Sequence, residues 1–187
     1  MVSRLIVDAD VCIKLGQSEK YCFLQQILPA LSAKVFIHQT VYDEILISAS
    51  VKKQLNALIS RGFLEIIDSD NLSTEEKTIY DATYSLLSAV MMNPHKPRQN
   101  HGEVCSLAIA KALSVPVFFT DERDLQPIID AIMNSGIDDI KCMRIVDVIN
   151  KIKFGEIEGF NRKQAKAMWV LSGKKKEVFD SDVWSKD

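Results

Sequence analysis

The stretch RLIVDADVCIKLG, residues 4–16, decides the fold that this sequence predicts. It begins with bulky apolar residues that are typical of a buried strand, and it continues through Asp8 and Asp10 into apolar residues at helical spacing. A buried strand that passes directly into a helix is the first half of a β-α unit. The two carboxylates repel each other when both are charged, so a positive partner is expected at this end of the strand.

The same alternation continues along the chain. Four further short apolar segments are typical of strands buried on both faces of a parallel sheet: residues 34–38, 63–67, 116–120 and 140–146. Apolar residues recur at helical spacing in the stretches between them: 41–49, 51–61, 75–90, 103–113 and 125–136. The order predicts an α/β domain over residues 1–155, with a central, mostly parallel sheet between helices.

Residues 156–187 are predicted to form a C-terminal extension outside this domain. A helix is expected over 160–173, ending at Gly173, and residues 174–187 form a tail that is either disordered or docked through Phe179 and Trp184. The polar, proline-containing segment 91–102 is predicted to be an exposed loop.

Composition excludes several classes of protein. The chain has 187 residues, of which 47% are hydrophobic and 26% charged, as in ordinary globular proteins. No apolar run approaches the roughly 20 residues that cross a bilayer, and the start lacks the pattern of a signal peptide. We therefore expect a cytoplasmic protein without a membrane segment. The four cysteines, which lack the spacing of a zinc site, are expected to be reduced core thiols.

Charge is distributed unevenly along the chain. Residues 1–150 carry 14 basic and 19 acidic side chains, whereas residues 151–176 carry 8 basic and 2 acidic ones. The basic segment is a candidate surface for phosphate groups, or simply a solvated helix face followed by a tail.

Acidic residues occur at positions that the predicted fold would bring together. Asp8 and Asp10 follow the first strand, and Asp121, Glu122 and Asp124 follow the fourth. Glu44 and Glu103 lie in the first turns of predicted helices. Because ligands of parallel sheets bind at the carboxyl ends of the strands, these acids are expected to converge there and to hold divalent metal ions.

Helix capping is the alternative explanation for several of these acids. Asn100 with Glu103, and Asp121 with Asp124, fit an N-cap residue followed three positions later by an acid. Ser73 with Glu76 shows the same pattern where no site is expected, so the pattern alone does not distinguish a cap from a ligand.

Three segments together resemble the PIN domains, a family of metal-dependent nucleases that includes toxins of bacterial toxin/antitoxin pairs. They are LIVDADVCIKL (residues 5–15), VYDEIL (residues 41–46) and HGEVCSLAIAKALSVPVFFTDERDL (residues 101–125), and the resemblance spans roughly residues 3–150. It implies a PIN-like α/β/α domain in which the metal-binding and catalytic acids are Asp8, Glu44, Glu103 and Asp121.

The resemblance leaves some roles open. Asp10 replaces a polar residue common in the family, and the last acid could be Glu122 instead of Asp121, with Asp124 as a further candidate. The C-terminal extension is not explained by the family.

Carboxylate ligands suit Mg²⁺ or Mn²⁺, and such ions activate water for phosphodiester hydrolysis. The implied substrate is RNA, single-stranded or structured, and the implied partners are a small antitoxin protein and a second copy of the chain. Basic residues expected to contact nucleic acid are Lys96, Arg98, Arg123, Lys174, Lys175 and Lys176.

Two other functions fit parts of the sequence. The segment DADVC, residues 8–12, also resembles the nucleophile motif of haloacid-dehalogenase-like phosphatases, although a convincing lysine after a later strand is missing. A PIN-like module that binds a partner without catalysis is the second alternative, in which the acids are only helix caps.

Overall fold

The computed structural model describes residues 1–45, 48–96 and 98–185. Parts of the predicted helix 41–49, of the predicted loop 91–102 and of the extension 156–187 therefore lie outside the described residues.

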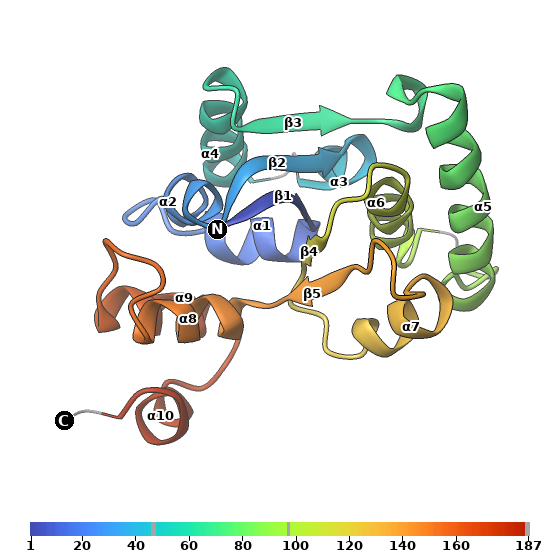
Figure 1. Ribbon diagram of the computed structural model, residues 1–187. Coiled ribbons are helices and arrows are strands. Elements are labelled where there is room, and N and C mark those ends of the chain that lie inside the picture. The colour runs from blue at the N-terminus through green and yellow to red at the C-terminus, as the bar shows by residue number, and fades with distance from the viewer. Residues whose placement is uncertain (46–47, 97, 186–187) are drawn as a thin grey trace.

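The described residues form a five-stranded sheet with the order β3-β2-β1-β4-β5, in which every neighbouring pair is parallel (Figure 1). The strands are β1 (Val2–Val7), β2 (Ser32–His38), β3 (Leu64–Ile67), β4 (Val117–Phe119) and β5 (Lys141–Met143). The α/β fold with a central parallel sheet is thus confirmed. The last strand was predicted too long: it ends at Met143, because Ile145 and Val146 begin a helix.

Helices connect the strands and cover both faces of the sheet. In the main part of the chain they are α1 (Ala9–Gly16), α2 (Phe23–Leu31), α3 (Gln39–Ile45), α4 (Ala49–Ser60), the short turn η1 (Ser69–Asn71), α5 (Thr74–Met91), α6 (His101–Ala112), α7 (Leu125–Ile132) and α8 (Ile145–Lys153). Helices α2 and α8 were not among the predicted ones. The first two residues of α8, Ile145 and Val146, were predicted as strand because they are β-branched and apolar.

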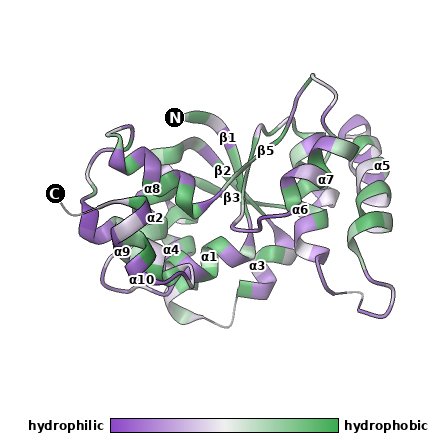
Figure 2. Ribbon diagram, turned by 90° about the horizontal axis from the view of Figure 1, so that it is seen from below, coloured by the Kyte–Doolittle hydropathy of each residue, from purple (hydrophilic) through white to green (hydrophobic). Residues whose placement is uncertain are grey.

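Alternate side chains of the strands pack into two separate cores. Leu5 and Val7 of β1 face a core that includes residues of α1, α2, α4, α8 and α9, whereas Ile6 faces one that includes residues of α5, α6 and α7. Figure 2 shows these two helical layers on opposite sides of the sheet. Because successive strand residues point to opposite faces, a strand buried on both sides is apolar throughout, as the sequence of β1 is.

The C-terminal extension packs onto the first of these cores. It contains α9 (Arg162–Leu171) and the short helical turns α10 (Lys176–Val178) and η2 (Phe179–Val183). Phe179 is fully buried, and its ring centroid lies 6.2 Å from that of Trp169 and 6.4 Å from that of Trp184. Of the two possibilities for the tail, docking through Phe179 and Trp184 is therefore confirmed and disorder is wrong for the described part.

Two smaller expectations concern membranes and thiols. Within the described ranges, none of the helices is both long and apolar enough to cross a membrane. All four cysteines are free; Cys12 and Cys105 are buried, whereas Cys22 and Cys142 are partly exposed.

Candidate metal and nucleic-acid site

Asp8 lies at the end of β1, the strand at which the strand order of the sheet reverses. Strand β1 has β2 on one side and β4 on the other, so successive crossovers leave a crevice at the carboxyl end of β1, where ligands bind in folds of this kind. The Asp8 side chain is buried at this point. Its Oδ1 accepts a hydrogen bond from Ala9 N at 2.8 Å, and Thr120 Oγ1 donates to Oδ2 at 3.2 Å. Asp8 thereby both caps α1 and connects the ends of β1 and β4.

Burial makes the charged form of Asp8 unfavourable. Desolvation, followed by the charge of Glu103, raises the pKa of its carboxyl from 3.8 to about 7, although the two hydrogen bonds act to lower it. Among the described residues, no cation forms an ion pair with Asp8. A cation bound beside Asp8 would therefore stabilise the charged form of its carboxyl.

Glu103 and Glu44 belong to the same electrostatic group. Burial raises the pKa of Glu103, as do the charges of Glu122 and Asp10. Burial and the charge of Glu103 raise the pKa of Glu44. Asp8, Glu103, Glu44 and Glu122 therefore interact electrostatically near the carboxyl edge of the sheet.

A glycine allows Glu44 to approach α6. A Cβ atom added to Gly102 would lie 3.2 Å from Glu44 Oε2 and 3.1 Å from a methyl group of Val41. The Glu44 carboxylate thus lies against Gly102 in the first turn of α6, next to Glu103. The stretch HGE in the sequence contains this signal, but its glycine was not used in the prediction.

The helix cap that was the alternative explanation for Glu103 is not formed. Asn100 has a left-handed backbone, with φ of 61°, and its side chain makes no cap hydrogen bond. It donates instead to Met91 O at 2.9 Å. Glu103 is therefore available to a ligand.

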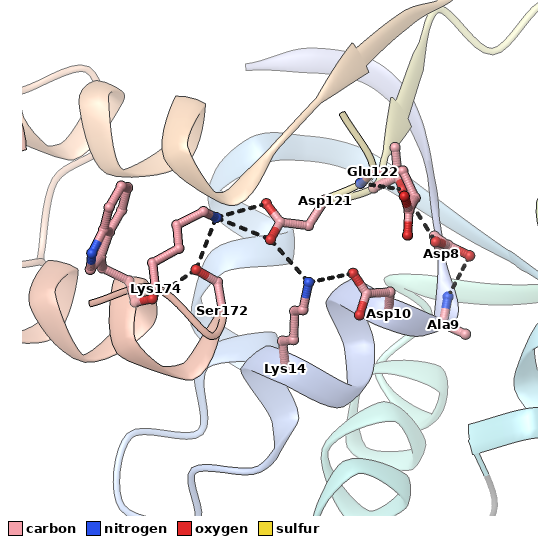
Figure 3. Close-up of polar contacts among 10 residues, drawn as sticks. Asp8, Ala9, Asp10, Lys14, Asp121, Glu122, Ser172 and Lys174 are labelled. Carbon is pink, nitrogen blue, oxygen red and sulfur yellow. Dashed lines mark hydrogen bonds and ion pairs between the residues drawn. The ribbon is translucent and has the colours of Figure 1, made fainter. Parts of the chain in front are cut away.

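Asp121 lies in a different environment from these acids. Its Oδ2 accepts from Lys14 Nζ at 3.1 Å, and both of its oxygens accept from Lys174 Nζ, at 3.2 and 3.1 Å. Lys14 also donates to Asp10 Oδ2 at 2.6 Å. Figure 3 shows these side chains in a row from Lys174 to Asp10, with Asp8 beyond them. Asp121 is thus already neutralised by two lysines, one of them from the C-terminal extension.

Glu122, unlike Asp121, lies near Glu103 and the other acids. Its backbone N–H donates to Thr120 Oγ1 at 3.3 Å, the same hydroxyl that donates to Asp8. With Glu103 and Asp124 it lines a cleft of about 390 Å³ between the ends of α5, α6 and α7. Among the described residues, Glu122 has no ion pair. Of the two acids that the sequence left open after β4, Glu122 is the one that interacts with Glu103.

The chemistry of these donors fits a hard divalent cation, because they are carboxylate oxygens without cationic partners. As the side chains lie, however, no group of three or more histidines, cysteines or acids in the described part of the chain is arranged to hold a metal ion. Binding Mg²⁺ or Mn²⁺ would therefore require the carboxylates of Asp8, Glu44, Glu103 and Glu122 to move closer together.

The basic residues predicted to contact nucleic acid do not lie together. Arg98 lines a hollow beside Glu44, and Lys96 is in the exposed loop after α5. Arg123 and Lys174 line a separate cleft of about 480 Å³, together with Lys14 and Arg144. Lys175 and Lys176, although adjacent in sequence, are exposed and do not line it. The prediction missed Arg144, yet its position directly after β5 follows the same rule that selected Asp8.

Comparison with known proteins adds a distant likeness. No protein-family model matches the chain, and no curated protein matches it. A similar solved structure is the crystal structure of VapBC2 from Rickettsia felis bound to a DNA fragment from their promoter. The match has 14% identity and a TM-score of 0.45, and it covers 75% of this chain and 98% of that chain. The α/β assignment rests on the strand order and parallel pairing described above.

Proposed function

We propose that this protein is a PIN-like, metal-dependent endoribonuclease, which hydrolyses phosphodiester bonds in RNA. The observation that carries the proposal is a group of acids without cationic partners at the carboxyl ends of β1 and β4, namely the buried Asp8 together with Glu44, Glu103 and Glu122. Such a group destabilises the free protein through its own repulsion, so selection for a ligand explains it better than selection for stability does.

Asp8, Glu44, Glu103 and Glu122 are the residues that would hold Mg²⁺ or Mn²⁺. Bound there, the ion would supply an activated water and charge neutralisation for the departing oxygen. Thr120 fixes the orientation of Asp8 through its hydroxyl. Glu103, with its raised pKa, is suited to accept a proton from the attacking water. Asp121 holds Lys14 and Lys174 in place, although the resemblance to PIN domains would make it a ligand.

The partners implied by the resemblance are part of this proposal. A toxin-type protein of this family would act in the cytoplasm with a small antitoxin, and the resemblance also implies a homodimer. Co-purification of this chain with the product of an adjacent reading frame would test the antitoxin partner directly.

The decisive experiment is a cleavage assay on a labelled single-stranded RNA with Mg²⁺, with Mn²⁺ and with EDTA. We expect cleavage with either ion, none in EDTA, and a loss of at least about 100-fold in Asp8→Asn. Asp70→Asn is the matched control, because Asp70 has an 86% exposed side chain outside the acidic group.

Equal cleavage by the parent protein and Asp8→Asn would identify a contaminating nuclease and refute the proposal. No cleavage by either protein, together with no binding of Mn²⁺, would favour the alternative of a binding module without catalysis.

A further inference from the structure

The acidic group, formed by Asp8, Glu44, Glu103 and Glu122, borders a cleft of opposite charge. This second cleft, of about 480 Å³, carries four cationic side chains and one acid: Lys14, Arg123, Arg144, Lys174 and Asp121. They come from α1, from the segment between β4 and α7, from the end of β5 and from the segment after α9. Three of these segments follow strands of the parallel sheet, so the cleft occupies the edge at which ligands of such sheets bind.

The cleft has more positive charge than its own acid can neutralise. Asp121 is shared between Lys14 and Lys174, and Lys14 is also paired with Asp10. By contrast, Arg123 and Arg144 form no ion pair with any of the described residues. Two guanidinium groups without a partner, beside two lysines held by one carboxylate, make a site for an anion.

The C-terminal extension builds one wall of the cleft. Lys174 lies over the ring of Trp169, with Nζ 5.2 Å from the ring centroid, and donates to Ser172 Oγ at 3.0 Å. The segment is fixed by the buried Phe179 and by Arg162, which donates to Asp180 Oδ1 at 2.5 Å. The position of Lys174 is therefore set by packing, whereas the exposed Lys175 and Lys176 lack such support.

The basic cleft and the acidic group are contiguous. Asp121 and Glu122 are consecutive residues, one facing each side, and Asp10 pairs with Lys14 while its charge raises the pKa of Glu103. A polyanion in the basic cleft would thus extend directly to the acids.

We propose that the C-terminal extension completes a phosphate-binding cleft, in which Arg123, Arg144, Lys14 and Lys174 hold the backbone of a single-stranded nucleic acid next to the acidic group. This inference rests on the proposed function for the choice of nucleic acid as the anion. It assigns a role to residues 156–185, which the resemblance to PIN domains leaves unexplained.

The test is the salt dependence of binding, measured by fluorescence anisotropy with a labelled single-stranded RNA in EDTA, so that cleavage does not interfere. We compare Arg144→Gln and Lys174→Gln with Lys175→Gln and Lys176→Gln, which remove the same charge outside the cleft. Each of the first two is expected to weaken binding several-fold and to reduce the slope of log K against log[salt] by about 0.7, the value for one phosphate contact. The two control variants are expected to leave both quantities nearly unchanged.

The outcomes separate this inference from the proposed function. Equal effects of all four variants would indicate diffuse attraction by the tail and would overturn the inference that the cleft binds nucleic acid. The absence of an effect in all four variants would overturn it as well. Because Lys174→Gln also releases Asp121, Arg144→Gln is the cleaner variant; its circular dichroism and melting temperature verify folding. RNA binding that depends on Arg144, in a protein without nuclease activity, would refute the proposed nuclease function and support the inference that the cleft binds nucleic acid.

Discussion

Asp121 and Glu122 are neighbours in the sequence but belong to two oppositely charged regions. Asp121, whose side chain is only 4% exposed, is surrounded by Lys14 and Lys174. Glu122 adds its charge to that of Glu103, in a group where burial and repulsion raise the pKa values of three carboxyls. Two acids that follow the same strand are therefore not equivalent candidates for binding a metal ion. The electrostatic balance of each acid is the better guide, because a cation stabilises most where negative charge is not yet neutralised.

The largest effect is expected when the two neighbours are neutralised separately. If Glu122 is a ligand, Glu122→Gln lowers RNA cleavage by at least about 100-fold. Asp121→Asn should lower it by less than about tenfold, and it should strengthen RNA binding in EDTA, because two lysines lose their internal partner. Cleavage rates and anisotropy on the same preparations measure both effects. A greater loss of cleavage in Asp121→Asn than in Glu122→Gln would reverse the assignment and restore Asp121 as the fourth ligand.

A second prediction uses the stability of the protein without metal. The folded protein keeps a proton on Asp8 up to about pH 7, whereas the unfolded chain loses it near 3.8. The free energy of unfolding therefore decreases as the pH rises between these values, and the loss attributable to Asp8 is complete above about pH 7. With about 1.36 kcal/mol per pKa unit, this loss is at most about 4 kcal/mol.

Asp8→Asn should remove that dependence. The variant is expected to be more stable than the parent in EDTA at neutral pH, because asparagine keeps the N-cap acceptor for Ala9 N without the charge. Added Mn²⁺ should stabilise the parent more than the variant, since the metal binds the folded parent more tightly. Urea unfolding at several pH values, with and without Mn²⁺, measures both effects. A variant less stable than the parent in EDTA, with an undiminished response to Mn²⁺, would mean that Asp8 is only a helix cap.

The fold could be read from the sequence because its strands are buried on both faces. Runs such as LIV and VFF are apolar without alternation, which is the pattern of a parallel sheet between two helical layers. The end of β5 could not be read, because Arg144, Ile145 and Val146 suit a strand equally well by composition. The backbone N–H of Arg144 bonds to Asp147 Oδ2 at 2.8 Å, and this contact accompanies the start of α8.

The candidate site could be located but not resolved into its parts. The rule that ligands gather at the carboxyl ends of parallel strands selected Asp8, Asp121 and Glu122 together. It could not distinguish the last two, because Asp121 is paired with Lys174, more than 50 residues later in the chain, whereas Glu122 is not. Lys174 itself was grouped with Lys175 and Lys176 as part of a basic run, and only the packing of Trp169 and Phe179 separates it from them.

The smallest effect concerns two acids that have the same sequence pattern in different electrostatic settings. Ser73 and Glu76 form a capping box: Glu76 N donates to Ser73 Oγ at 3.3 Å, and Ser73 N donates to Glu76 Oε2 at 2.8 Å. Asn100 and Glu103 have the same spacing but form no such pair. Glu76 supports its helix through this pair, whereas Glu103 is expected to destabilise the protein without metal.

Substitutions at the two helix starts should therefore change stability in opposite directions. Ser73→Ala is expected to lower the free energy of unfolding by about 1 kcal/mol, the usual value of an N-cap, with or without Mn²⁺. Glu103→Gln is expected to raise it in EDTA at neutral pH, because the raised pKa of Glu103 shows that its charge is less favourable in the folded protein than in the unfolded chain. Glu76→Gln is the matched control, because glutamine keeps the cap hydrogen bond in an exposed turn and should change stability little. Denaturant titrations of the three variants in EDTA measure these differences. If Glu103→Gln instead lowered stability as Ser73→Ala does, Glu103 would be a structural residue of α6, and the acidic group would lose the member that interacts with Asp8, Glu44 and Glu122 alike.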